Sequence, residues 1–260
     1  MAFARVGEVE LFYTDEGEGE SPMLFVHGYS CDSHDWIWQL PHFARTHRVI
    51  AVDLRGHGRS SVPDDGFEAR TFAADIAALL DRLSCDPVVA TGHSLGAVVV
   101  SALAVERPSL VRALVCVDPG YLVADEVATS IKPLIDALDA APVPTVQALI
   151  SRGYTDATPA HLRTWHLRRL AGVPEHVLCQ AIVNLNTLAV RSASEPYLRR
   201  RSCPVLSLYA AGERVGIERA LFGDDRSRAL SWDGCGHWLH QERPSEFNAL
   251  VDDWLTTLET

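Results

Sequence analysis

The chain of 260 residues is long enough for one α/β domain with a sizeable core. Hydrophobic residues make up 47% and charged residues 22%, which is typical of a globular protein and excludes a disordered or fibrous chain. Acidic residues outnumber basic ones by 34 to 23, so the net charge is −11. Because binding to phosphate groups needs a cationic face, we expect neither nucleic acid nor a membrane surface as a partner.

Motifs for metals, nucleotides and export are missing from the sequence. The six cysteines form no C-x-x-C pair and no zinc-like spacing, and no glycine-rich phosphate loop is found. The chain does not open like a signal peptide, and no apolar run reaches the roughly 18 residues of a membrane span. We therefore expect no metal, no cofactor and a cytoplasmic location.

Short apolar runs alternate with helical patterns in the first half of the chain. Continuous apolar runs predict strands buried on both faces of a parallel sheet, at 23–26, 48–52, 87–91 and 113–117. The alternating segment 9–13 predicts a hairpin at the sheet edge, and helices are expected at 71–83 and 97–106. Such alternation predicts an α/β fold with a doubly wound, mostly parallel sheet, whose functional residues follow the carboxyl ends of the strands.

The strand rhythm stops at about residue 121 and returns at about residue 202. Between these points, helical patterns are expected near 124–139, 145–153, 159–171 and 174–190. Strands resume at 204–209 and 228–232, and a last amphipathic helix is expected at 244–258. We therefore predict an α/β core from residues 1–120 and 202–260, with an all-helical cap from 121–201.

The strongest local signal is Gly92-His93-Ser94-Leu95-Gly96, which matches G-x-S-x-G between a predicted strand and a predicted helix. This context places Ser94 on a sharp strand-to-helix turn as a candidate nucleophile, where side chains at Gly92 and Gly96 would collide with neighbouring elements. His237 follows the last predicted strand, from which an imidazole can reach back to take the serine proton. The competing His240 falls in the helix that follows.

Four motifs in the expected order resemble the α/β-hydrolase superfamily, in its serine-nucleophile branch: His27-Gly28, Asp53-Leu54-Arg55-Gly56-His57-Gly58-Arg59-Ser60, Gly92-His93-Ser94-Leu95-Gly96 and Gly236-His237-Trp238. The resemblance covers essentially the whole chain outside the cap. It implies that the backbone N–H groups of Tyr29 and Leu95 form an oxyanion hole. It says much less about the substrate, since one fold hosts many reactions.

The third triad member departs from the commonest pattern of that superfamily. In most relatives the acid lies in a segment resembling G-x-x-D after the cap, where this chain has Gly212-Glu213-Arg214-Val215. The other place used in the family is the end of the strand before the cap, where Asp118 follows an apolar run. We expect Asp118 to hold the His237 tautomer, with Glu213 as the alternative.

Aromatic residues near the predicted site are candidates for the substrate pocket. They are Tyr121, Tyr154, Trp165 and Trp36, although each of them can equally serve in packing.

The motifs favour a serine hydrolase that cleaves a small-molecule carboxylic ester or lactone through an acyl-enzyme. A serine at position 94 argues against the dehalogenase and epoxide-hydrolase branches, whose ester intermediates need a carboxylate. An acid before the cap resembles zearalenone-type lactone hydrolases, which suggests a bulky lactone. Carbon–carbon bond hydrolases remain possible.

Two further alternatives belong to other classes. Cofactor-independent dioxygenases of N-heteroaromatic rings share the fold and the early aspartate, and their histidine–aspartate pair deprotonates the substrate. A non-catalytic ligand receptor on the same fold is the other. The sequence leaves the oligomeric state open.

Overall fold

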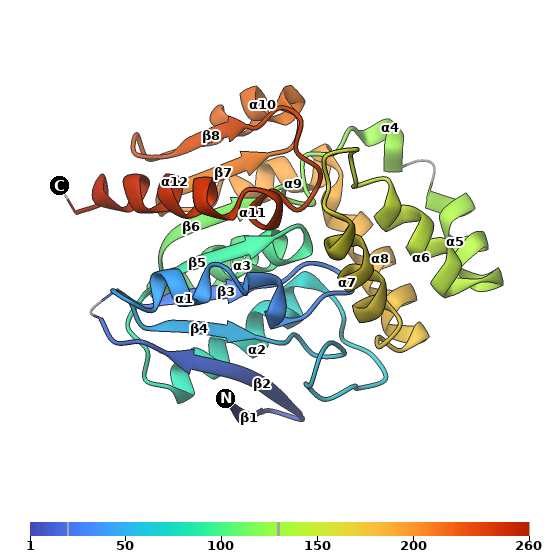
Figure 1. Cartoon of the computed structure of the whole chain (residues 1–260), viewed down its shortest axis with the longest axis horizontal. Coiled ribbons are helices and arrows are strands. Elements are labelled where there is room, and N and C mark those ends of the chain that lie inside the picture. Colours follow the sequence, from blue (N-terminus) through green and yellow to red (C-terminus); the bar gives the residue numbers. More distant parts are fainter. Residues whose placement is uncertain (20, 129–130, 260) are drawn as a thin grey trace.

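The core of the molecule is one eight-stranded sheet, seen in the computed structural model, which describes residues 1–19, 21–128 and 131–259 (Figure 1). The strand order is β1-β2-β4-β3-β5-β6-β7-β8. β1 and β2 pair antiparallel at one edge, and β2 pairs antiparallel with β4. The strands β3 to β8 run parallel to one another. The bounds are β1 Ala2–Val6, β2 Val9–Glu16, β3 Met23–Val26, β4 Val49–Val52, β5 Val88–His93, β6 Val111–Val117, β7 Val205–Tyr209 and β8 Arg228–Ser231. The predicted mostly parallel sheet and edge hairpin are confirmed.

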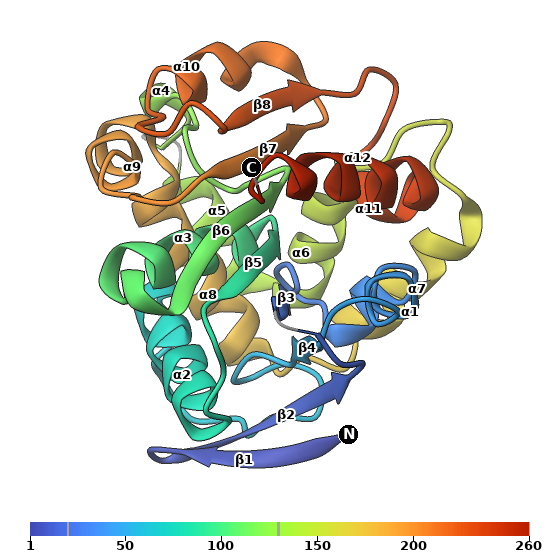
Figure 2. The same cartoon turned by 90° about the vertical axis from the view of Figure 1, so that its left-hand side faces the viewer.

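Helices cover both faces of this sheet, as Figure 2 shows along its edge. On one face lie α2 (Ala69–Arg82) and α3 (Leu95–Glu106), within a buried cluster that includes Phe72 and Leu103. On the other face lie α1 (Leu40–Phe43), α11 (Leu239–Glu242) and α12 (Pro244–Thr256), within a second cluster. β3 and β4 are buried along their whole length, which explains why their sequences are continuously apolar.

Between β6 and β7, the described residues form helices and the loops that connect them, apart from an isolated bridge that pairs Val123 with Val190. They are α4 Asp125–Ala128, α5 Ile131–Ala140, α6 Pro142–Ser151, α7 Ala160–Leu170, α8 Glu175–Ala189 and α9 Arg191–Leu198. The helix predicted at 124–139 corresponds to two helices, and its residues 129 and 130 lie outside the described part of the chain. The sequence did not predict α9, because its Pro196 indicates a helix break.

The helices α5 to α8 lie beyond one end of the sheet, on the right of Figure 1. In the described ranges, no helix combines the length and the apolar character needed to cross a bilayer. Because α5 to α8 lie beyond one end of the sheet, we expect a functional site where the loops at the strand ends meet these helices.

Candidate active site

Ser94 stands between the end of β5 and the first residue of α3, in a backbone conformation that L-residues rarely adopt (φ 52°, ψ −112°). Its N–H donates to the carbonyl of Val117 on the next strand over 2.9 Å. Such strain persists only where the surroundings enforce it, and it is characteristic of functional sites. The N–H of Leu95 begins α3, so the helix itself offers it no acceptor.

Two glycines of the motif leave room for this turn. A Cβ at Gly92 would run into the backbone carbonyl of Gly96, and a Cβ at Gly96 would run into the carbonyl of Val26 on β3. Both contacts would lie far inside van der Waals distance, and both involve backbone atoms that cannot swing away. The structure therefore confirms that a side chain at Gly92 or Gly96 would collide with neighbouring elements, as expected from the sequence.

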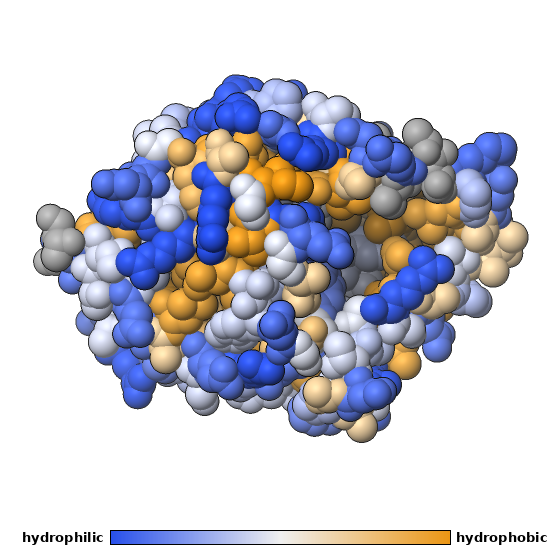
Figure 3. Space-filling view, turned by 90° about the horizontal axis from the view of Figure 1, so that it is seen from above, coloured by the Kyte–Doolittle hydropathy of each residue, from blue (hydrophilic) through white to orange (hydrophobic). Residues whose placement is uncertain are grey.

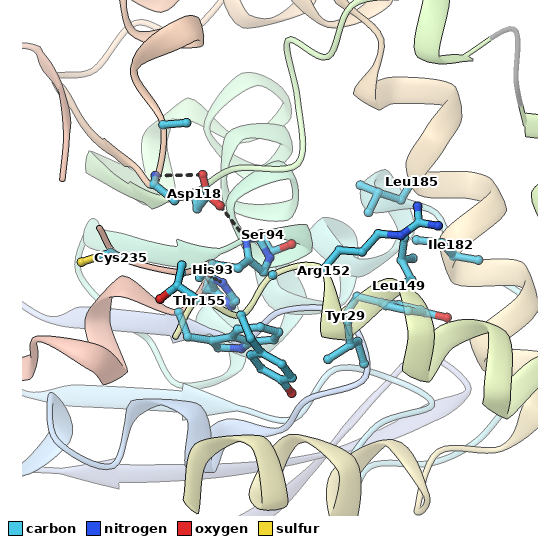
Figure 4. A pocket seen from close by; sticks show the side chains of 18 residues that line it. Tyr29, His93, Ser94, Asp118, Leu149, Arg152, Thr155, Ile182, Leu185 and Cys235 are labelled. Carbon is cyan, nitrogen blue, oxygen red and sulfur yellow. Dashed lines mark hydrogen bonds and ion pairs between the residues drawn. The ribbon is translucent and has the colours of Figure 1, made fainter. Parts of the chain in front are cut away.

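His237 lies on the loop after β8, and its ring faces Asp118. Its Nδ1 is 2.5 Å from Oδ2 of Asp118, which follows β6 directly and has a φ of 36° (Figure 4). Because a carboxylate only accepts, this bond puts the proton on Nδ1 and leaves the lone pair on Nε2. The backbone of His237 is held on both sides, since its N–H donates to the carbonyl of Gly153 and its carbonyl accepts from Nε2 of His93.

The carboxylate of Asp118 is buried but well supplied with donors. Its Oδ1 accepts from Nη2 of Arg214 over 3.1 Å and from the N–H of Ala210 over 3.3 Å. Burial alone would raise the pKa of Asp118, but the hydrogen bond and charge of His237, together with Arg214, hold that pKa below its ordinary value. Asp118 is therefore an anion in the neutral pH range.

Glu213, the alternative acid, lies elsewhere. It sits in a short 3₁₀ helix, Gly212–Arg214, with an exposed side chain, and it is not among the residues that line the cavity next to Ser94. Val215, at the position where a G-x-x-D pattern would have its aspartate, begins the following helix α10 (Val215–Arg219) and offers no carboxylate. The structure brings Asp118, and not Glu213, to His237.

A cavity of about 500 Å³ contains Ser94, Asp118 and His237 in its wall. Its lining comes from the strand-end loops on one side and from α6, α8 and the loop after α6 on the other (Figure 4). The residues are Tyr29, His93, Ser94, Asp118, Leu149, Ile150, Arg152, Gly153, Tyr154, Thr155, Ile182, Leu185, Ala210, Ala211, Cys235, Gly236, His237 and Trp238. Figure 3 shows hydrophobic surface beside a recess between the core and the helices to its right.

Of the four aromatic residues expected to bind substrate, Tyr154 lies in the cavity wall. Tyr29, expected to supply a backbone N–H, also lies there, with its hydroxyl bonded to the carbonyl of Leu178 in α8.

The other three aromatic residues lie outside the lining, because each is committed to packing. The hydroxyl of Tyr121 donates to buried Glu218 over 2.7 Å. Trp36 is fully buried against Phe25. Trp165 stacks on Trp38 with ring centroids 5.8 Å apart.

The sequence did not single out the apolar residues that line the cavity from the helices between β6 and β7, or the arginine in its wall. Leu149, Ile182 and Leu185 face it from α6 and α8, and the spacing of the last two, on one helix face, was the available signal. Arg152 follows α6, and in the described residues its guanidinium has neither an ion pair nor a hydrogen bond. A free cation in an otherwise mostly apolar wall suits an anionic or strongly polar part of a ligand.

One group of described side chains has metal-ligand chemistry. Candidate ligand atoms of Asp35, His93 and His240 lie within 4.8 Å of one another, and all three residues are buried. Arg169 from α7, however, already forms an ion pair with Asp35, and a guanidinium beside that carboxylate opposes binding of a divalent cation. Burial lowers the pKa of both histidines, so we interpret the group as a neutral-histidine network that joins α7 to the core.

Comparison with known proteins gives the family. A model described as the alpha/beta hydrolase fold matches residues 21–161. The chain belongs to the alpha/beta hydrolase family. Its curated relatives include a bifunctional esterase/perhydrolase of Acinetobacter calcoaceticus and a non-heme haloperoxidase of Rhodococcus erythropolis.

Two curated relatives align over most of this chain. The dihydrolipoyllysine-residue acetyltransferase component of the acetoin cleaving system of Cupriavidus necator is 27% identical over 96% of this chain and 67% of its own length. The soluble epoxide hydrolase of a Corynebacterium species is 29% identical over 93% of this chain and 83% of its own. Other curated relatives match over shorter parts, including one of which the match covers 29% of its own length.

Among solved structures, an N-acyl homoserine lactone degrading enzyme superimposes with a TM-score of 0.82 at 24% identity, over 97% of this chain and 99% of that one. At that identity, the likeness shows the fold alone.

Proposed function

We propose that the protein is a serine hydrolase that cleaves a small-molecule carboxylic ester or lactone with Ser94, His237 and Asp118. The observation that carries the proposal is that strained Ser94 and the Asp118-bound His237 share one cavity. A nucleophile, a base and a group that orients the base are the parts that acyl transfer needs.

The proposed reaction has two halves. Oγ of Ser94 attacks the substrate carbonyl while Nε2 of His237 takes the hydroxyl proton, and the N–H groups of Tyr29 and Leu95 bind the oxyanion. The imidazolium then protonates the leaving alkoxide, which departs and leaves an acyl-enzyme. In the second half, His237 deprotonates water, the hydroxide attacks the acyl carbonyl, and the proton returns to Oγ as the acid is released.

The charge of Asp118 stabilises the imidazolium in both halves. In the described residues no hydrogen bond joins Ser94 to His237. Such bonds commonly tighten only when substrate is bound.

The lack of a hydrogen bond between Ser94 and His237 in the described residues favours a second candidate, a cofactor-independent dioxygenase. In that reaction the His237–Asp118 pair would deprotonate a ring hydroxyl of an N-heteroaromatic substrate, and Ser94 would only hydrogen-bond it. The two candidates share the base and differ in whether Ser94 forms a covalent bond.

The cavity limits the substrates worth testing. A volume of about 500 Å³ and a wall that contains Leu149, Ile182 and Leu185 suit a ligand with a substantial apolar part. We therefore favour aryl esters and bulky lactones, each tested in a neutral form and in a carboxylate-bearing form because of Arg152.

The experiment compares the wild type with Ser94→Ala on this panel and on hydroxyquinolones, and it measures both acid release and oxygen uptake. For a hydrolase we expect kcat to fall by at least about a thousandfold in Ser94→Ala, with no oxygen consumed by either protein. Ser151→Ala, which removes an exposed hydroxyl at the end of α6, is the matched control and should keep wild-type activity. Oxygen uptake with hydroxyquinolones that survives Ser94→Ala would replace the proposal by the dioxygenase.

A further inference from the structure

Arg214 reaches the active-site acid from a segment far away in the sequence. Its Nη2 donates to Oδ1 of Asp118 over 3.1 Å, and its Nη1 donates to the carbonyls of Pro119 and Tyr121 over 2.6 and 3.0 Å. The guanidinium also lies 4.8 Å from the ring centroid of Tyr209 on β7. One side chain therefore ties together the carboxylate and the backbone of the loop that carries it.

This loop needs such support because its backbone is strained. Asp118 has a φ of 36°, in the left-handed region that residues other than glycine adopt only at an energetic cost. The carbonyls bound by Arg214 belong to the residue after Asp118 and to one two positions further on. A bond at each point resists relaxation of the loop, which would carry the carboxylate away from His237.

The guanidinium also sets the charge balance around His237. Basic groups beside the pair of Asp118 and His237 include Arg214, His93, whose ring centroid lies 4.6 Å from that of His237, and Arg152 in the cavity wall. Burial lowers the pKa of His93, which leaves that ring neutral. Arg214 is thus the cation in direct contact with the carboxylate, and it offsets part of the negative charge that His237 experiences.

We propose that Arg214 is a positioning residue that acts through Asp118: it fixes the carboxylate against Nδ1 of His237 and tempers the basicity of that imidazole. This inference rests on the proposed hydrolase function. Arg214 touches no reacting atom in the proposal, and its effect reaches the substrate only through the bond between Asp118 and His237.

The sign of the pH effect follows from the charges. Without the guanidinium, the carboxylate attracts a proton on His237 more strongly, so the imidazole is protonated at a higher pH. A protonated His237 cannot serve as base, so the acid limb of the kcat/KM profile should move to higher pH. A merely structural arginine would change the stability of the fold and leave this limb in place.

The test uses Arg214→Gln, Arg214→Lys and the matched control Arg219→Gln. Arg219 ends α10 and donates twice to the carbonyl of Ala229, away from Asp118. With the ester that the wild type hydrolyses best, Arg214→Gln should lower kcat about tenfold to a hundredfold with little change in KM and should shift the acid limb upward. Arg214→Lys should recover part of the loss, and Arg219→Gln should behave as the wild type.

Coupling to Asp118 is the second part of the test. In an Asp118→Asn background, Arg214→Gln should reduce kcat by much less than it does in the wild type, because its route of action is already removed. Equal losses in both backgrounds, or an acid limb that does not move, would overturn the inference.

A readout that does not need turnover separates this inference from the proposed function. The imidazole of His237 can be titrated by NMR in the wild type and in Arg214→Gln. A higher pKa of His237 in the variant supports the role of Arg214 even where no panel ester is cleaved. An unchanged pKa contradicts it even where the enzyme is an active esterase.

Discussion

At the scale of single residues, the chemistry depends on which carboxylate meets His237. Asp118 and Glu213 both follow a strand, and a pattern of residue types along the chain cannot choose between two loop ends. The structure separates them, because Oδ2 of Asp118 lies 2.5 Å from Nδ1 of His237 while Glu213 is exposed. Which carboxylate reaches His237 depends on the path of the loops that carry Asp118 and Glu213, and sequence patterns do not specify that path.

Replacement of each acid by its amide gives a matched pair of variants. Asp118→Asn keeps the shape of the side chain but removes the charge and favours the wrong tautomer of His237. We expect kcat for ester hydrolysis to fall by about a hundredfold to ten-thousandfold. Glu213→Gln should stay within about twofold of the wild type, since exposed substitutions away from a site are usually mild. Initial rates at saturating substrate decide this, and a larger loss in Glu213→Gln would contradict the assignment.

At the scale of elements, the turn from β5 to α3 is the feature that the sequence predicted best. Its glycines, its strand and its helix could all be assigned, because G-x-S-x-G constrains the backbone through local collisions. The helices between β6 and β7 were predicted less well. The structure divides the helix predicted at 124–139 into α4 and α5, and Pro196 concealed α9, because tertiary contacts there outweigh local preference.

The tightness of this turn can be measured with two alanine substitutions. Gly96→Ala forces a Cβ into the carbonyl of Val26, and we expect the free energy of unfolding to fall by about 1–3 kcal/mol or more. Gly216→Ala, in α10, meets no atom within 4 Å, so it should be neutral or should stabilise the protein by up to about 1 kcal/mol. Urea unfolding followed by circular dichroism measures both. A Gly96→Ala protein as stable as the wild type would show that the turn can accommodate a Cβ at position 96.

At the scale of the whole molecule, the sheet places residues distant in sequence around one cavity. Ser94, Asp118 and His237 follow three different parallel strands, and the rule that such strand ends share an edge made this convergence predictable. The aromatic lining of the cavity was not predictable in the same way. Tyr121, Trp36 and Trp165 are as aromatic as Tyr154, and only the packing of the helices against the core decides which ring faces the cavity.

The central claim is that Ser94 is a nucleophile that forms a covalent intermediate. Its most direct test is reaction of the wild type with an organophosphonate ester probe, followed by mass spectrometry of the digested protein. The account predicts one adduct, on the peptide that contains Ser94, formed together with loss of esterase activity and absent from Ser94→Ala. Continued substrate conversion by a protein whose Ser94 stays unmodified would contradict it.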